Sequence, residues 1–435
     1  GNIVYVPSLD SVEEVKVHTT MFDASLGHSN GGAVNITTRG GTNEFHGTAY
    51  LYKRWAALDA NSWVNNRLGL NKPPISYRQF GGTIGAPVTI PKLYNGTNRT
   101  FFFASREEDT LANAVSRQSR VPTEQERNGD FSQTLSRTGT AFGLFDPATT
   151  QIVGTRAERQ SFPGNRIPAS RLDPTGVAVL KAFPLPNQSG ATQIGRFNWG
   201  ASGVSGTSNY NTNVRLDHAW SDRHRMFGRF SRLFRDQGAV VFFPGPNDFP
   251  IDGTDSIADI SRKFHSFALD DTFIFSPTFA GSLRYGFSRC TQRPARGAYG
   301  VDGASIALPN STLSNPRFAG YPLFRLGENM ATIGGFLSVE ATEQHSRLAT
   351  ANKQTRSHSL KFGLDYRMSN WNRIVPGNAG PGDFTFSPVY TQQDPFANVS
   401  ADRSGTSMAS LLLGAPASGS LGYASPVSMR HHYVG

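Results

Sequence analysis

Three groups of side chains in this sequence are of types that carry out chemistry. His218 and His224 flank the stretch AWSDR and could meet across a hairpin as metal ligands. The adjacent carboxylates of 107–109 are of the kind that glycosidases pair for acid–base catalysis. The glycines of GGTIGAP, at 81–87, are of the kind that lines a phosphate-binding loop.

Each group also has a simpler structural interpretation. Polar positions at the rim of a sheet account for the histidines, and a solvated strand end accounts for the carboxylates. The glycine stretch is followed by no Lys-Ser or Lys-Thr, and glycines packed closely in a strand explain it better. His431 and His432 are neighbours in a strand-like segment, so their side chains point to opposite faces and chelate poorly. The sequence contains no HExxH, G-x-S-x-G, Walker A or C-x-x-C motif, so we predict no enzyme activity, no metal site and no cofactor.

Composition limits the class of protein. Among 435 residues, 11% are aromatic, 17% are charged, 45 are Gly and 26 are Pro, which favours strands and long turns over helices. No apolar run of about 18 residues occurs, which excludes an α-helical membrane span but not a β-barrel, whose lipid-facing residues alternate with polar ones. The net charge of +10 is scattered, without a basic run of five, so we expect no nucleic-acid partner. The single cysteine, Cys290, cannot form an intramolecular disulfide.

Alternation of apolar and polar residues is the main structural signal. In RSHSLKFGLDYRMS, Leu360, Phe362 and Leu364 fall on one face of a strand, and Lys361 and Asp365 fall on the other. Segments of this kind predict about eleven strands of about ten residues, the length that a tilted strand needs to cross a bilayer. The predicted strands lie at about 45–54, 76–90, 99–107, 209–220, 224–235, 261–275, 278–290, 343–352, 356–369, 403–413 and 419–433.

The connections between these strands alternate between long and short. The first is long (55–75), the second is short (91–98) and the third is very long (109–208). An antiparallel meander with this parity has tight turns at one end and large loops at the other, as outer-membrane barrels have, whereas a Greek-key sandwich has no reason to keep it. Within 109–208, DPTGVAVLKAFP predicts a helix with Asp173 as N-cap and Pro184 at its end.

Several segments resemble a known family, in the same order along the chain. VPSLDSVEEVKVHTTMFDASLGHSNGGAVNITTRGGTNEFHGTAY (6–50) resembles the end of the plug domain and the first barrel strand of TonB-dependent outer-membrane receptors. The resemblance is greatest to the Oar-like branch, in which a carboxypeptidase-regulatory-like domain precedes the plug. It continues through YRQFGGTIGAPV, TFFFASREE, VPTEQERNGDFS, FPGNRIPASRLDP, PLPN and RLDHAWSDRHRMFGRFS, and so covers most of 6–235.

The resemblance implies an all-β fold, a partial antiparallel transmembrane β-barrel of about eleven strands preceded by the C-terminal edge of a plug domain. Residues 1–41 are then the end of the plug, and 42–435 are the N-terminal half of the barrel with long extracellular loops. A plugged transporter barrel has about 22 strands, and the chain begins at Gly1 without a Met, a signal peptide or a TonB box. We therefore expect a fragment of a longer protein.

Two glycine pairs are assigned to the junction between plug and barrel. Segments 12–17 and 33–38 are expected as the last plug strands, and Gly31 and Gly32 bend one into the next. Gly40 and Gly41 are expected to turn the backbone from the plug into the barrel wall, because glycine takes positive φ freely.

The function implied by the resemblance is TonB-dependent uptake of a large or scarce solute across the bacterial outer membrane, driven by the proton gradient. The implied partners are the TonB complex, reached through an N-terminal region that this sequence lacks, outer-membrane lipid, and an extracellular ligand. A siderophore, an oligosaccharide, a peptide or a protein would each fit as the ligand. Two alternatives stay open: a surface adhesion or interaction protein that is anchored by the barrel and binds a partner through its long loops, and a secreted carbohydrate-binding or hydrolytic β protein.

Aromatic side chains in the outward loops are the candidates for ligand contact, because flat apolar rings suit sugars, peptides and chelates. An aromatic girdle at the membrane interfaces, or packing within the loops, explains the same residues without a ligand. The candidates are Trp55, Trp63, Phe242, Phe243, Tyr321, Phe324 and Trp371.

Overall fold

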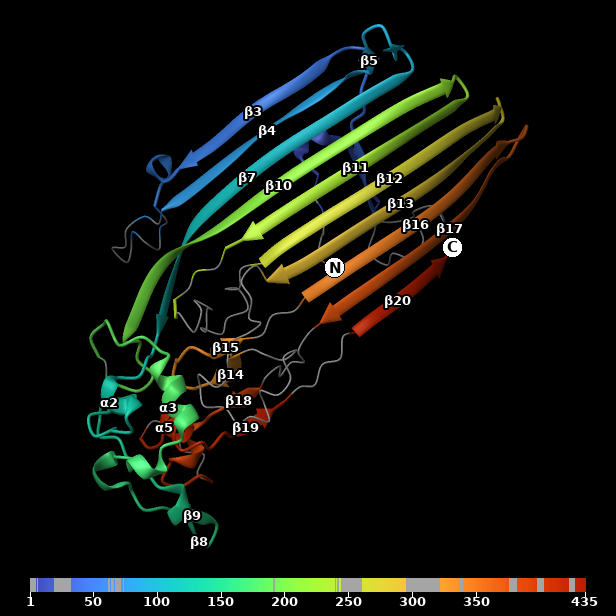
Figure 1. Cartoon of the computed structure of the whole chain (residues 1–435). Helices are drawn as coiled ribbons and strands as arrows, with labels where there is room; N and C mark the ends of the chain where they lie inside the picture. The colour runs from blue at the N-terminus through green and yellow to red at the C-terminus, as the bar shows by residue number, and fades with distance from the viewer. Residues whose placement is uncertain are drawn as a thin grey trace.

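The main element of the structure, a computed structural model, is a ten-stranded antiparallel sheet in which each strand pairs with the next long strand along the chain (Figure 1). The described residues are 5, 7–18, 33–61, 63, 66, 72, 74–190, 192–238, 240, 242–243, 260–294, 321–335, 339–374, 382–396, 403–421 and 427–435. From one edge to the other the strands are β3 (His46–Trp55), β4 (Ile75–Pro87), β7 (Thr100–Ser119), β10 (Trp199–Ser221), β11 (His224–Gln237), β12 (Ile260–Ser276), β13 (Phe279–Pro294), β16 (Val339–Gln354), β17 (Ser359–Ile374) and β20 (Val427–Val434).

The sheet confirms the predicted antiparallel meander and its parity of connections. Tight turns at 222–223, 277–278 and 355–358 lie at one end, which we call the turn end. The connections at the other end, the loop end, are much longer, including 120–198 and 375–426. A twelve-residue connection at the turn end, 88–99, holds the small hairpin of β5 (Thr89–Ile90) and β6 (Tyr94–Asn95).

One predicted strand is wrong. Residues 403–413 do not join the sheet, and they contain the helix α5 (Ser407–Leu412). Its N-cap is Thr406, whose side chain accepts a hydrogen bond from the Met408 N–H, and all of its residues are buried. A helix buried on every side carries no polar stripe, so its sequence lacks the periodicity that identifies a helix. Within the described residues the sheet therefore has ten strands and not eleven.

The two faces of the sheet differ in what they contact. We call the inner face the one that touches the hairpin of β1 (Val12–His18) and β2 (Ala33–Thr38), and the other the outer face. Cross-strand register assigns Ser105, Asn213, Ser231 and Ser266 to the inner face in one row. The neighbouring row places Ala104, Val214, Phe230 and Phe267 on the outer face. In these two rows the sheet is polar on its inner face and apolar on its outer face.

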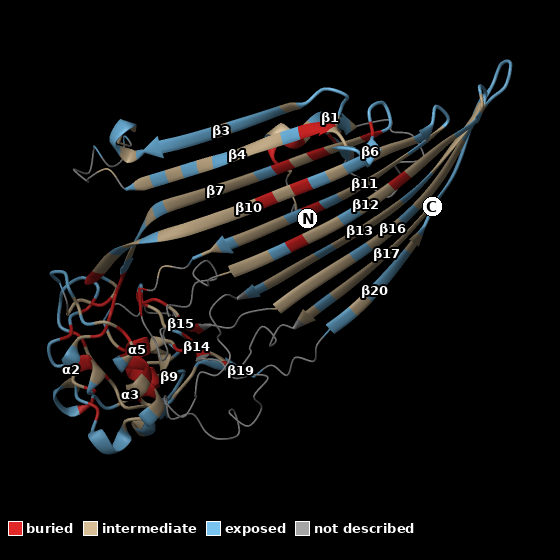
Figure 2. Cartoon of the chain, turned by 45° about the horizontal axis from the view of Figure 1, so that its top comes forward, coloured by how far each residue is buried: buried red, intermediate tan, exposed pale blue. Residues whose placement is uncertain are grey.

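The loops gather into a separate body beyond the loop end, which we call the loop domain, and its core holds most of the fully buried residues (Figure 2). It consists of 120–198, 321–335, 382–396 and 403–421, with residues 242–243 packed into it. Its regular elements are α2 (Glu124–Arg127), α3 (Pro174–Lys181), α5, the hairpin of β8 (Gln151–Val153) and β9 (Arg156–Glu158), and a four-stranded sheet of β15 (Ile333–Gly335), β14 (Tyr321–Arg325), β18 (Asp383–Thr385) and β19 (Ser418–Ser420). Short 3-10 helices lie at Leu9–Ser11, Ala56–Leu58, Pro147–Thr149, Pro163–Asn165, Ala169–Arg171 and Pro388–Tyr390. Among the described residues, no helix combines the length and apolarity needed to cross a membrane.

Candidate functional site: the inner face and the loop domain

The hairpin β1–β2 is fixed to the inner face by Arg215 of strand β10. Arg215 donates from Nη1 to the carbonyl oxygen of Thr38, at 2.8 Å, while its other nitrogens bind the Asp217 carboxylate at 2.7–3.0 Å. Arg229 donates to the Thr38 hydroxyl at 3.3 Å. The Tyr5 ring stacks on Phe264, with centroids 4.8 Å apart. Tyr5 and Thr38 therefore lie against the inner face.

In the connector before β3, Gly41 is needed for space, and neither glycine of the pair is needed for a special backbone angle. Neither Gly40 nor Gly41 has a positive φ, so the reason predicted for this pair is wrong. A Cβ on Gly41 would lie 2.8 Å from both the N and the carbonyl C of Phe102, and closer still to its oxygen. On Gly40 the nearest atom would be Oδ2 of Asp217, at 3.2 Å. Gly31 and Gly32 lie outside the described residues.

A polar pocket of about 250 Å³ opens on the inner face, with Pro7 at one side. It brings together Glu107 and Asp109 from β7 with Arg235 and Arg262 from β11 and β12, and Cys290 lines one side. Acidic and basic groups therefore face the same space, which suits a ligand that carries both charges or many hydroxyls.

The carboxylates that were considered for acid–base catalysis have separate partners in the structure. Glu107 accepts hydrogen bonds from Tyr50 and Gln79, at 2.5 and 3.0 Å. Glu108 lies on the outer face and pairs with Arg106. These two carboxylates point to opposite faces of the sheet, so they do not form a catalytic pair.

The histidines at the turn end also have separate partners. His218 Nδ1 lies 2.7 Å from the Thr100 hydroxyl, and His224 Nε2 lies 2.7 Å from Asp271 Oδ1. Trp220 stands between the two rings. Within the described part of the chain, no group of three or more His, Cys, Asp or Glu side chains could hold a metal ion.

A buried ion pair joins Glu126 of the motif VPTEQERNGDFS to Arg120, the residue just before the motif. Arg120 Nη2 donates to both oxygens of Glu126, at 2.7 and 2.8 Å, and both side chains are almost fully buried. Glu126 also accepts from the Thr123 N–H at 2.8 Å, which completes a capping box at the start of α2. The motif that carried part of the family resemblance is thus a folding element of the loop domain.

The helix α3 confirms the prediction from DPTGVAVLKAFP. Asp173 is its N-cap and accepts from the Gly176 N–H at 2.9 Å. Gly176 allows the helix to approach the backbone of Leu411 in α5, because a Cβ there would lie 2.9 Å from the Leu411 carbonyl carbon. The two helices are more than two hundred residues apart in the sequence and belong to different connections, so the loop domain is built by long-range packing.

A buried carboxylate ties the connection between β13 and β16 to the loop domain. Glu328, 5% exposed, accepts a hydrogen bond from the Ser407 N–H at 3.1 Å and contacts the Ser407 hydroxyl through its other oxygen. Burial raises the pKa of Glu328 above its ordinary value, and the bonds from Ser407 and the charge of Arg137 counter this in part.

Glu328→Gln is expected to make the loop domain more stable than wild type at pH 7, whereas Glu328→Ala should destabilise it by about 1–3 kcal/mol by leaving Ser407 unsatisfied. The glutamine keeps both contacts and removes the buried charge. Because the folded pKa is raised, the stability from this group is fully present below the unfolded pKa and is lost as the pH rises through the folded pKa. The advantage of the glutamine should therefore vanish near pH 4. Hydrogen exchange of the α5 amides between pH 4 and 8 measures this, and an advantage that grows on acidification would contradict it.

The predicted aromatic contacts fall into different environments. Phe242, Phe243 and Phe324 are buried in the core of the loop domain, where they cannot reach a ligand, so packing within the loops accounts for them. Trp371 lies on the inner face and donates to Glu340 at 2.6 Å. Trp55 and Trp63 are 51% and 70% exposed.

Tyr321 is the first residue of β14, and its side chain lies outside the described part of the structure. The inner-face pocket was missed from the sequence, because its strand residues belong to five strands and become neighbours only through strand register.

Comparison with known proteins gives a match over most of the chain. The profile of the family described as "Outer membrane beta barrel domain" matches residues 37–435. Over 223 residues, 49% of this chain, the sequence is 25% identical to the TonB-dependent transporter Oar of Myxococcus xanthus. The match covers 20% of that protein, so the chain spans about a fifth of the length of this curated relative.

Two solved structures give weaker likenesses. A mutant ferric enterobactin receptor of Pseudomonas aeruginosa is 12% identical, with a TM-score of 0.41 over 86% of this chain and 38% of that one. The ferric-catecholate import receptor Fiu of E. coli K12, in an open form, is 14% identical, with a TM-score of 0.35 over 98% of this chain and 56% of that one. With TM-scores below 0.5, these two likenesses support no conclusion about function.

Proposed function

The chain belongs to the family of outer membrane β-barrel domains and resides in the bacterial outer membrane, and on this premise we propose that it is part of a TonB-dependent receptor of the Oar-like branch. In this role it binds a large or scarce solute outside the cell and imports it with energy from the proton gradient. The solute is bound and moved, with no bond made or broken.

The observation that carries this proposal is the hairpin held against the inner face. An open pore would leave the polar inner face to water, whereas here Arg215 and Arg229 bind backbone and side chain of β2. A body inside the barrel closes the pore to diffusion, so passage requires that the body be moved. Moving it takes an energy source, which in this family of transporters is the TonB complex.

These contacts support the proposed domain division. Residues 1–41 form the C-terminal edge of the plug, and 42–435 form barrel wall and loops. The TonB complex acts through a region before residue 1, and the extracellular ligand is a siderophore, an oligosaccharide, a peptide or a protein. Ligand binding at the loops and the inner-face pocket shifts the plug toward a state that TonB can engage, by favouring one conformation over another.

The plug contact is tested with a large antibiotic as the probe. In the full-length protein, the double variant Arg215→Ala, Arg229→Ala should loosen the hairpin and raise vancomycin sensitivity several-fold. Arg232→Ala is the matched control, because this arginine lies on the outer face of the same strand as Arg229. If the double variant assembles in the membrane and its cells stay as resistant to vancomycin as wild-type cells, the hairpin does not close the pore.

Transport can be tested before the ligand is identified. Compounds removed from a rich growth medium are measured by mass spectrometry for wild-type cells, a strain lacking this gene and a strain lacking TonB. The proposal expects the same compounds to remain in the medium for both mutants. Depletion that needs this protein but not TonB would overturn it, and an adhesion defect without any uptake defect would favour the barrel-anchored adhesion protein.

A further inference from the structure

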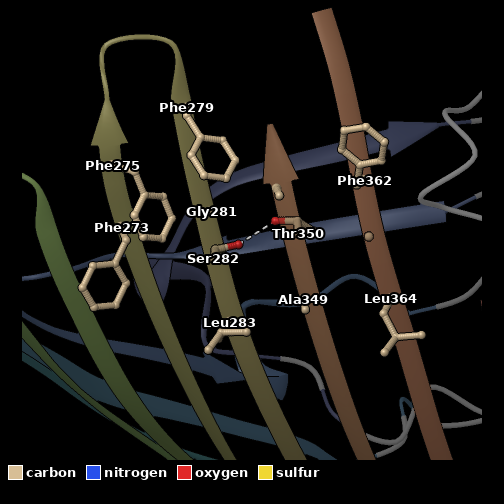
Figure 3. Close-up of a pocket in the computed structure, with 12 residues that line it drawn as sticks. Phe273, Phe275, Phe279, Gly281, Ser282, Leu283, Ala349, Thr350, Phe362 and Leu364 are labelled. Atoms are coloured by element: carbon tan, nitrogen blue, oxygen red, sulfur yellow. Dashed lines mark hydrogen bonds between the residues drawn. The ribbon is translucent and has the colours of Figure 1, made fainter. Parts of the chain in front are cut away.

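The outer face carries an apolar groove near the turn end that the transport function does not use. Its volume is about 590 Å³, and it crosses β12, β13, β16 and β17. Phe273 and Phe275 form one bank and Phe362 and Leu364 the other (Figure 3). The outer face meets lipid in a protein of the outer membrane, so a hollow in this face lies within the membrane.

The groove exists because small residues lie between large ones in the cross-strand rows. In one row Phe273 pairs with Gly281, Gly281 with Ala351, and Ala351 with Phe362. In the next row Ala349 lies between Leu283 and Leu364. The floor is therefore glycine and alanine, and the banks are rings and branched chains. The ring of Phe275 stacks on that of Phe279, with centroids 5.0 Å apart, and closes one side.

The floor ends in a positive charge at the turn end. Ala349, Ala351 and Lys353 follow one another on the outer face of β16, and Lys353 pairs with Phe279 across the strands. The Lys353 ammonium lies 5.7 Å from the centre of the Phe279 ring and 3.2 Å from the Thr278 hydroxyl. Tight turns of outer-membrane barrels face the periplasm. Lys353 is thus at the level of the headgroups of the periplasmic leaflet.

We propose that this groove is a binding site for one phospholipid of the periplasmic leaflet, with an acyl chain along Ala349 and Ala351 and the phosphate at Lys353. The lengths agree, because four strand residues span about 13 Å and half of a bilayer's hydrocarbon core is about 15 Å. The charge also agrees, since the ammonium is complementary to a phosphate and stands where the phosphate would be. The groove is continuous with the lipid-facing surface around it. This site depends on the position of the chain in the membrane and not on transport.

The experiment uses the full-length protein in nanodiscs of phosphatidylglycerol and phosphatidylcholine in equal amounts, analysed by native mass spectrometry. Wild type is expected to retain one phospholipid, with phosphatidylglycerol preferred. Ala349→Phe fills the floor and should lower the retained lipid at least five-fold. Ala104→Phe is the matched control, because Ala104 is an outer-face alanine on β7 away from the groove, and it should retain lipid as wild type does. Lys353→Gln should lower the retained phosphatidylglycerol about five-fold, as about 1 kcal/mol per basic residue near anionic lipid implies.

Equal retention by Ala349→Phe and wild type would overturn the site, as would a second protein chain in place of lipid in the mass spectrum. Assembly of each variant is checked by its heat-dependent migration in electrophoresis. If Ala349→Phe does not assemble, Ala351→Val provides the smaller filling change, with the same expected direction. If the protein imports solute normally but retains no lipid, the proposed lipid site is wrong while the proposed transport function stands.

Discussion

Arg120→Ala is expected to destabilise the loop domain by about 3–5 kcal/mol, because it leaves the Glu126 carboxylate buried without its partner. Glu126 would keep the bonds from Thr123 and Thr134, which do not neutralise its charge. Hydrogen exchange of the α3 amides in the full chain measures the effect. At 1.4 kcal/mol for each factor of ten, their protection should fall by a factor of roughly a hundred to a few thousand.

The chain offers a matched control in the same domain. Arg166 pairs with Asp130 at 3.1 Å, but the Arg166 side chain is 65% exposed. Arg166→Ala should cost at most about 1 kcal/mol, as exposed pairs do. The double variant Arg120→Met, Glu126→Gln removes both charges and should be more stable than Arg120→Ala alone. If Arg120→Ala and Arg166→Ala destabilise the loop domain equally, burial of the ion pair does not determine its contribution to stability.

Gly41→Ala is expected to prevent assembly of the barrel, and Gly40→Ala to be tolerated. At Gly41 the added Cβ meets the backbone of Phe102, which is held in β7 by its neighbours and cannot move aside. The cost should exceed the about 1–3 kcal/mol of ordinary overpacking. At Gly40 the nearest atom belongs to the Asp217 side chain, which needs to shift by only a few tenths of an ångström.

The measurement is the amount of heat-modifiable, membrane-inserted protein for each variant. Gly41→Ala should give at least ten-fold less than wild type, and Gly40→Ala an amount close to wild type. If Gly41→Ala inserts normally, residues 39–45 can take another path between β2 and β3. Gly41 then does not need to lie close to Phe102.

Sequence patterns predicted the sheet well where both faces are defined. The alternation around Leu360 and Phe362 confirms β17, because an apolar outer face and a polar inner face impose a period of two. The ends of β7 and β10 next to the loop domain, residues 108–119 and 199–208, were predicted as loop. Gly200, Gly203 and Gly206 interrupt the alternation there, and the residues support the loop domain instead of facing lipid.

The loop domain could not be predicted from the sequence. Its core joins residues as distant as Val121 and Leu412, and no local pattern records which connections will pack together. The capping box at Thr123 and Glu126 was not predicted, although these residues have its spacing, and the buried partner of Glu126, Arg120, is recognisable only from the structure. The inner-face pocket and the outer-face groove depend in the same way on strand register.

The loop domain also limits how this surface can change by recombination. Its core is shared by connections that begin after β7, β11, β13 and β17, so each connection supplies only part of one apolar interior. An exchange that replaced a single connection with that of a related gene would leave α3 without α5, or Glu328 without Ser407. Viable chimeras should therefore inherit the four connections as one block, from residue 120 to residue 421, and phage or antibody escape by whole-loop replacement should follow the same boundaries.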